Sequence, residues 1–168
     1  MKRIAVFVDG SNFFYMQKNC LHWWIDPKRL LEWIGTRGDV VDASYYASID
    51  PENERQASYL KALSYMGFSV EGKQIKAILQ SDGTQTHKAN LDIEIVLDMF
   101  NTIDNFDEAV LVSGDADFSR ALQVLRARGK QYMVLSTKGF VASEIRQVAG
   151  MHYKDLVELR NQIEKKNN

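Results

Sequence analysis

Three short, continuous apolar segments are the feature of this sequence that most restricts its fold. They cover residues 4–8, 109–112 and 132–135. Apolar runs of this length are typical of strands buried on both faces, as in parallel sheets that helices cover on either side. Weaker strands are expected at 40–47 and 68–78, the second from apolar residues at alternate positions. The sequence therefore predicts a buried, mostly parallel sheet of about five strands.

Helical patterns separate these strands along the chain. Pro27 follows Asp26 and Pro51 follows Asp50, an arrangement typical of the first turn of a helix. Further helices are expected where apolar residues recur at three- or four-residue spacing, at 90–103, 118–128, 140–149 and 151–163. Regular alternation of strand and helix predicts an α/β sandwich with right-handed crossover connections.

Length and charge restrict the domain organisation and the class of protein. The chain has 168 residues, and we expect a single domain over 1–160 followed by a polar tail over 161–168. The 21 basic and 22 acidic residues leave a net charge of −1, which argues against a histone-like or an acidic disordered protein. Nucleic-acid binding through a local patch stays open.

Cysteine content and hydropathy indicate the compartment. The single cysteine, Cys20, excludes an intrachain disulfide and a zinc site built from cysteines. The apolar run at the N-terminus is too short for a signal peptide, and no run approaches the length of a membrane span. We therefore expect a cytoplasmic protein that has no membrane partner.

Acidic residues follow two of the apolar segments at the point where each predicted strand ends. Asp9 precedes Gly10 after the first segment, and Asp115 and Asp117 follow Gly114 after the second. Ligands of open α/β sheets bind at the carboxyl ends of the strands, so neighbouring strands would bring these carboxylates together. Oxygen ligands favour Mg²⁺ or Mn²⁺ over zinc. The pattern predicts a divalent-metal site.

Structural roles explain some of the same residues. Asp9 and Asp117 are suited to cap helices, whereas Asp115 is expected within the turn. Asp92, in the first turn of the helix expected from residue 90, would also interact favourably with the helix dipole. Asp98 lies six residues further, on a different helical face, and is expected to support a neighbouring group.

The sequence lacks the signature motifs of several enzyme classes. The chain contains no phosphate loop of the form Gly-x-x-x-x-Gly-Lys-Ser/Thr, no Gly-x-Gly-x-x-Gly after a strand and no Gly-x-Ser-x-Gly nucleophile elbow. Its three histidines, His22, His87 and His152, are scattered along the sequence. A ribonuclease mechanism based on two histidines therefore has little support.

Three motifs together carry a family resemblance. They are Val-Asp-Gly-Ser-Asn at 8–12, Lys88-x-x-x-Asp92 followed by Leu-Asp-Met at 97–99, and Leu-Val-Ser-Gly-Asp-Ala-Asp-Phe at 111–118. In this order they resemble the LabA-like branch of the NYN-domain family, over residues 2–157. Asn90-Leu91 stands where the family often has Gly-Val, which changes the start of the helix and removes no carboxylate.

The resemblance implies a fold and a set of site residues. The fold would be a three-layer PIN-like sandwich with strand order 3-2-1-4-5, in which the first and fourth strands are neighbours. The residues implied as metal ligands are Asp9, Asp92, Asp115 and Asp117. Asn12 would be their catalytic companion, Ser113 would line the pocket, and Lys88 and Asp98 match recurring family positions.

The expected activity is hydrolysis of RNA phosphodiester bonds by a water that Mg²⁺ or Mn²⁺ activates. Ser11, Lys88, Ser113 and Arg120 are the expected substrate-binding residues. Lys88 is equally suited to pair with Asp92. Two alternatives stay open: a non-catalytic RNA-binding or regulatory module on the same fold, and a small-molecule phosphohydrolase.

Binding of single-stranded or structured RNA would need a local surface, because the chain as a whole is not basic. The basic candidates are Lys73, Lys76, Lys88, Arg120, Lys138 and Arg146. The aromatic candidates for base stacking are Phe13, Tyr15, Trp23 and Trp24, of which at least one tryptophan is expected in the core or in a dimer interface. A homodimer is possible on this basis.

Overall fold

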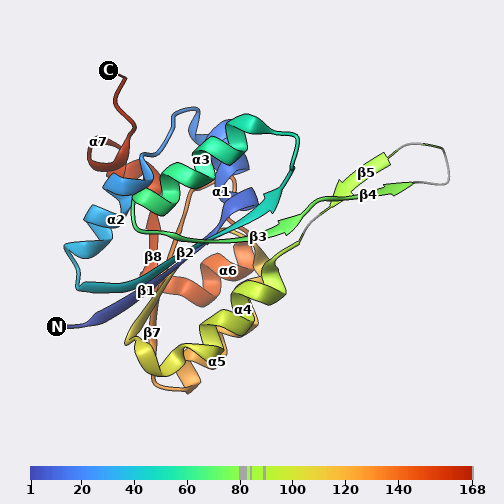
Figure 1. Ribbon diagram of the computed structural model, residues 1–168. Helices are drawn as coiled ribbons and strands as arrows, with labels where there is room; N and C mark the ends of the chain where they lie inside the picture. Colours follow the sequence, from blue (N-terminus) through green and yellow to red (C-terminus); the bar gives the residue numbers. More distant parts are fainter. Residues whose placement is uncertain (80–82, 84, 89, 168) are drawn as a thin grey trace.

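A six-stranded sheet forms the centre of the computed structural model (Figure 1). The structure describes residues 1–167 except 80–82, 84 and 89, and it describes only the backbone at 76–79 and 85–88. The strands of the sheet are β1 (Arg3–Asp9), β2 (Asp39–Ile49), β3 (Ser69–Gln74), β6 (Glu108–Val112), β7 (Gln131–Ser136) and β8 (Tyr153–Asp155). All five pairings are parallel, in the order β3-β2-β1-β6-β7-β8. The predicted order is confirmed, with one further strand at the edge.

Helices cover both faces of the sheet and complete three layers (Figure 1). One face carries α1 (Gly10–Met16), α2 (Pro27–Gly35), α3 (Glu54–Tyr65) and α7 (Arg160–Ile163), and the other carries α4 (Asp92–Asn101), α5 (Ser119–Ala127) and α6 (Ser143–Ala149). Alternate residues of β1 supply both cores: Val6 packs on the first face and Phe7 on the second. Within the described ranges no helix is long and apolar enough to cross a membrane.

The C-terminal segment differs from its prediction as one helix over 151–163. Tyr153–Asp155 forms β8 on the edge of β7, and a 3₁₀ turn and the short α7 follow. The helical spacing of Leu156, Leu159 and Ile163 misled the prediction, because short helical turns bury the same three side chains. Order also continues into the expected polar tail, where the Lys165 amide donates to the Trp24 carbonyl at 2.7 Å.

The strand expected over 68–78 is divided between two sheets. β3 ends at Gln74, and β4 (Lys76–Leu79) pairs instead with β5 (Gln85–Lys88) in an antiparallel hairpin. This hairpin projects away from the sandwich (Figure 1). The alternating apolar residues that suggested one long strand, Ile75, Ala77 and Leu79, therefore lie at the break and in β4, not in β3.

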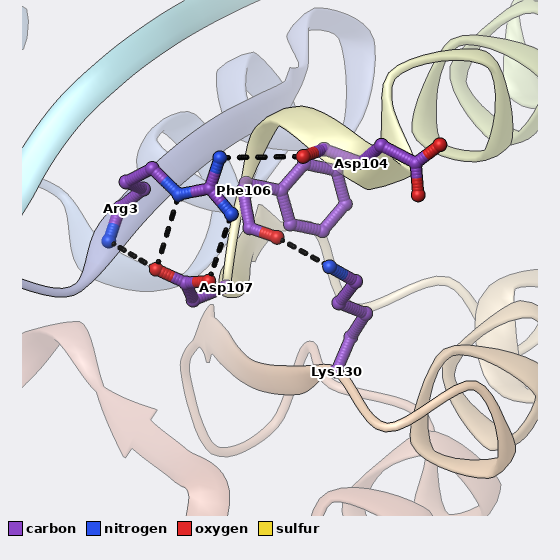
Figure 2. A network of polar contacts seen from close by, with 5 residues as sticks. All are labelled: Arg3, Asp104, Phe106, Asp107 and Lys130. Atoms are coloured by element: carbon purple, nitrogen blue, oxygen red, sulfur yellow. Dashed lines mark hydrogen bonds and ion pairs between the residues drawn. The ribbon is translucent and has the colours of Figure 1, made fainter.

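Arg3 and Asp107 join the start of β1 to the start of β6 (Figure 2). The Asp107 carboxylate accepts from the Arg3 amide at 2.8 Å and from the guanidinium at 3.0 and 3.3 Å. The same guanidinium donates to the Asp104 carbonyl, and Lys130 donates to the Phe106 carbonyl. The guanidinium holds the pKa of Asp107 at about 2. The contacts favour one register of β1 against β6, and that register decides which residues meet at the far end.

Gly10 permits the close approach of α1 to β2. A Cβ at this position would collide with the carbonyl oxygen of Tyr46 and lie 2.7 Å from Cε1 of Tyr45. The carbonyl belongs to the backbone of a central strand, so it cannot move aside without disturbing the sheet. Glycine is therefore required where β1 passes directly into α1.

We expect Gly10→Ala to lower the free energy of unfolding by about 1–3 kcal/mol, because the added methyl group overpacks this junction. The measurement is urea unfolding at equilibrium. Gly35→Ala is the matched control, since a Cβ at Gly35 would meet nothing within 4 Å. Equal stability of the two variants would contradict the packing argument.

Candidate metal centre

Three carboxylates converge at the carboxyl end of the sheet. Asp9 ends β1, Asp115 follows β6, and Asp92 opens α4. One oxygen of each lies within 4.8 Å of one oxygen of each of the others. Oxygens on opposite sides of one Mg²⁺ are about 4.2 Å apart, so small side-chain rotations would bring these three into one coordination shell. The donor set is oxygen only, which fits Mg²⁺ or Mn²⁺.

The pairing of β1 with β6 places two of these residues. Val8 lies opposite Val112, so Asp9 and Ser113 leave the sheet side by side. The Ser113 hydroxyl donates to Asp9 Oδ2 at 3.1 Å and accepts from the Asp115 amide at 3.2 Å. Ser113 is buried, and its two hydrogen bonds fix Asp9 relative to Asp115.

Asn12 joins the same two loops from the opposite side. Its Oδ1 accepts from the Gly114 amide at 2.9 Å. The backbone amide of Asn12 donates to Asp9 Oδ1 at 3.5 Å. Asp9 therefore caps α1 with one oxygen, while its other oxygen accepts from the Ser113 hydroxyl. Helix capping and membership of the acidic cluster are thus compatible for Asp9.

The third carboxylate depends on the position of α4. Asp92 is the first residue of this helix, and its amide donates to Asn90 Oδ1 at 2.8 Å. Ile95 and Met99 are fully buried against the sheet. Asp98 accepts from the Tyr46 hydroxyl at 2.8 Å and so joins α4 to β2. Asp98 therefore lies outside the cluster of three and contacts a residue of the sheet.

Crowding raises the pKa of two members. Burial raises the pKa of Asp9, opposed by hydrogen bonds from Ser113 and Asn12. Burial, and then the charges of Asp9 and Asp115, raise the pKa of Asp92 to about 7. Carboxylates held this close repel one another unless protons or a cation compensate them. The electrostatics of the centre therefore favour cation binding at neutral pH.

The turn after β6 differs from its prediction. Asp115, expected to be free of a capping role, caps the 3₁₀ turn Ala116–Phe118 and accepts from the Asp117 amide at 3.0 Å. Asp117, expected to cap a helix, is exposed in that turn, and its charge contributes to raising the pKa of Asp92. It is not among the three residues whose oxygens meet.

The remaining predicted residues belong to several different elements of the fold. Ser11 lines the pocket that contains the three carboxylates, and the Ser11 hydroxyl lies 3.3 Å from the Ser48 hydroxyl. Arg120 is exposed near the start of α5. Lys88 lies in β5, and its side chain is outside the described part of the chain, as is that of Lys76 in β4. Lys73 forms an ion pair with Glu94 at 3.0 Å.

A pocket of about 290 Å³ contains the cluster, and Ser11, Asn12, Tyr15, Asn90, Leu91 and Phe140 complete its lining. Phe140 is a lining residue that was not predicted from the sequence; its position after the third apolar segment, at another strand end, was the available signal. Lys138 and Arg146 line a separate cavity of about 510 Å³ beside β8.

Comparison with known proteins identifies the family. A family model described as NYN domain matches residues 3–158. The chain belongs to the NYN domain family. The domain is 43% identical to the low amplitude and bright protein LabA of Synechococcus elongatus (strain ATCC 33912 / PCC 7942 / FACHB-805), over 97% of this chain and 88% of that protein.

The fold of this NYN domain also occurs in a solved structure. A protein of unknown function from Vibrio parahaemolyticus RIMD 2210633 matches with a TM-score of 0.78 and 24% sequence identity, over 92% of this chain and 93% of that one. At this identity the match establishes a shared fold alone. The predicted family and fold class are therefore confirmed.

In metal-free buffer we expect Asp92→Asn to be more stable than the wild-type NYN domain at about pH 8 and equally stable at about pH 4. The pKa of Asp92 is about 7 in the folded protein, above the ordinary value of 3.8. The folded state therefore binds the proton more tightly, and stability is lost as the pH rises between these values. Thermal unfolding in EDTA over this range measures the difference.

Mg²⁺ should reverse the order at about pH 8, because a ligand that binds only the folded state stabilises it. Asp104→Asn is the control, since Asp104 is exposed and its carboxylate points away from the Arg3 network (Figure 2). A constant difference between wild type and Asp92→Asn at every pH would contradict the raised pKa.

Proposed function

We propose that this NYN domain is a ribonuclease that hydrolyses RNA phosphodiester bonds with Mg²⁺ or Mn²⁺ held by Asp9, Asp92 and Asp115. NYN domains are PIN-like and are generally nucleases. The observation that carries the proposal is the convergence of three carboxylate oxygens within 4.8 Å. A centre of this kind has too much negative charge to receive a phosphodiester unless a cation is present.

The side chains around the centre have distinct proposed roles. Asp9, Asp92 and Asp115 would hold the divalent cation, which would supply a nucleophilic water at neutral pH and stabilise charge on the phosphate and on the leaving 3′ oxygen. The Asn12 carbonyl oxygen accepts from the Gly114 amide, and its NH₂ group is proposed to donate to a phosphate oxygen. Ser113 holds Asp9 and Asp115 in place.

Residues around the three carboxylates would support the metal or contact the substrate strand. Asp117 is exposed, and its charge contributes to raising the pKa of Asp92, so we propose that it supports the metal from outside the three-residue set. Ser11 and Arg120 are proposed to contact flanking phosphates, together with Lys88 from the neighbouring hairpin. Phosphate contacts of this type position a strand without reading its sequence.

We expect Asp9→Asn and Asp115→Asn each to reduce RNA cleavage at least about 100-fold, since each removes a charge that holds the metal. The assay follows labelled RNA with Mg²⁺ or Mn²⁺ and identifies 5′-phosphate ends among the products. Asp104→Asn is the matched control, because it neutralises an exposed aspartate at the opposite end of β1.

Other outcomes would select the alternatives. Equal cleavage by wild type and both variants would contradict the metal mechanism. RNA that is bound and never cut would indicate an RNA-binding module. Turnover restricted to small phosphate esters would indicate a phosphohydrolase.

Ser113→Ala should raise the Mg²⁺ concentration needed for half-maximal cleavage about 10- to 100-fold, because partners that orient metal ligands have effects of this size. Ser119→Ala is the matched control: Ser119 is also buried, and its hydroxyl has no hydrogen-bond partner in the described structure. An unchanged Mg²⁺ requirement in Ser113→Ala would show that the hydroxyl does not organise the centre.

A further inference from the structure

Three aromatic side chains lie exposed beside the candidate metal centre. Phe14, Tyr15 and Trp24 are 45%, 52% and 49% exposed, and we call them the aromatic strip. The ring centroids are 5.3 Å apart between Phe14 and Tyr15 and 5.8 Å apart between Phe14 and Trp24. Exposed apolar groups in mutual contact mark interaction sites more often than scattered ones do.

The sequence neighbours of the strip point the other way. Phe13 and Trp23 are buried in the core, at 2% and 7% exposure. Within residues 10–27 the large apolar side chains left in solvent are all aromatic. The segment thus separates its aromatic residues into a core set and a surface set, and the core does not require the surface set.

A buried glutamine connects the two segments that carry the strip. Gln17 donates through its side chain to the Phe13 carbonyl at 3.1 Å and accepts from the Ile25 amide at 2.8 Å. It belongs to a π-helical turn, Gln17–Leu21, that follows α1. The Trp24 carbonyl is fixed by the Lys165 amide. The backbone beneath the strip is therefore held in place before any ligand arrives.

The strip is continuous with the acidic pocket. Tyr15 lines that pocket together with Asp9, Asp92 and Asp115, and Phe14 and Trp24 extend from Tyr15 across the surface. Lys18 lies at the edge, with its ammonium 6.0 Å from the Phe14 ring centroid. A strand with its scissile phosphate at the carboxylates would therefore place adjacent nucleotides over the strip.

We propose that the aromatic strip binds the unpaired bases of single-stranded RNA next to the scissile phosphate. The inference rests on the proposed function and names its substrate class. The Phe14 and Trp24 rings are tilted by 33° to one another, and Tyr15, which lines the pocket, stands at 78° to Phe14. Every base has a π-face, so such stacking tolerates many sequences.

Charge and geometry favour this occupant over a duplex or a protein. The net charge of −1 and the acidic centre leave little general attraction for phosphate, so stacking has to supply much of the affinity. Bases inside a duplex have both faces covered by their neighbours. A protein partner would not account for the place of Tyr15 in the lining of the acidic pocket.

The test measures binding separately from cleavage. Asp115→Asn, in which cleavage is expected to fall at least about 100-fold, is the background. Fluorescence anisotropy in Mg²⁺ follows a short labelled RNA strand and the same strand in a blunt duplex. Adding Trp24→Ala or Phe14→Ala should weaken single-strand binding about 5- to 100-fold. Trp24→Phe should retain most of it, and duplex binding should be weaker and insensitive to these changes.

Tyr65→Ala is the matched control, because Tyr65 is 82% exposed at the end of α3. The proposal is overturned if Trp24→Ala binds the single strand like its parent, or if no single strand binds at all. A change from dimer to monomer in Trp24→Ala, with RNA binding intact, would overturn it in favour of contact between two copies. Strip-dependent binding without cleavage by wild type would support the strip and reject the ribonuclease.

Discussion

The parallel pairing of β1 with β6 is the constraint on which the candidate centre depends. Because Val8 lies opposite Val112, the two strands end together, and Asp9 meets Ser113. At the other end of the same pair, Arg3 and Asp107 hold the strands in this register. A shift of one residue would turn every side chain to the opposite face and separate the acidic residues. The register thus connects a structural ion pair at one edge of the sheet with chemistry at the other.

The structure opposes the repulsion within the centre in two ways. Neutral donors stabilise Asp9, whose carboxylate accepts from the Ser113 hydroxyl and from the Asn12 amide. Asp92 instead holds a proton more readily, because burial and the charges of Asp9 and Asp115 raise its pKa to about 7. Groups with strongly shifted pKa values concentrate at functional sites because function requires charges that stability alone would disfavour. The repulsion among these carboxylates is therefore consistent with a functional site that binds a cation.

The sequence predicted the features that depend on local patterns. Apolar runs located the buried strands, and the acidic residues after them indicated the edge at which the centre lies. The family resemblance supplied the strand order and the choice of Asp92. Features that depend on tertiary pairing were missed. β8 has only three residues, all partly exposed, so it has no apolar run to announce it. The cap formed by Asp115 depends on a 3₁₀ turn that spacing alone does not distinguish from the start of α5.

Which aromatic residues are buried and which are exposed also depends on tertiary packing and could not be predicted from local sequence. In sequence, Phe13, Phe14, Trp23 and Trp24 are two pairs of adjacent aromatics, and nothing local states which member of each pair faces the core. The packing of α1 and of the segment after it against the sheet decides it, and the Gln17 hydrogen bonds tie the Ile25 backbone to α1. One buried amide side chain therefore holds the two pairs of rings in place relative to one another. Proposed chemistry at the strand ends and proposed affinity on the helix surface thus arise from separate interactions, and they meet at Tyr15.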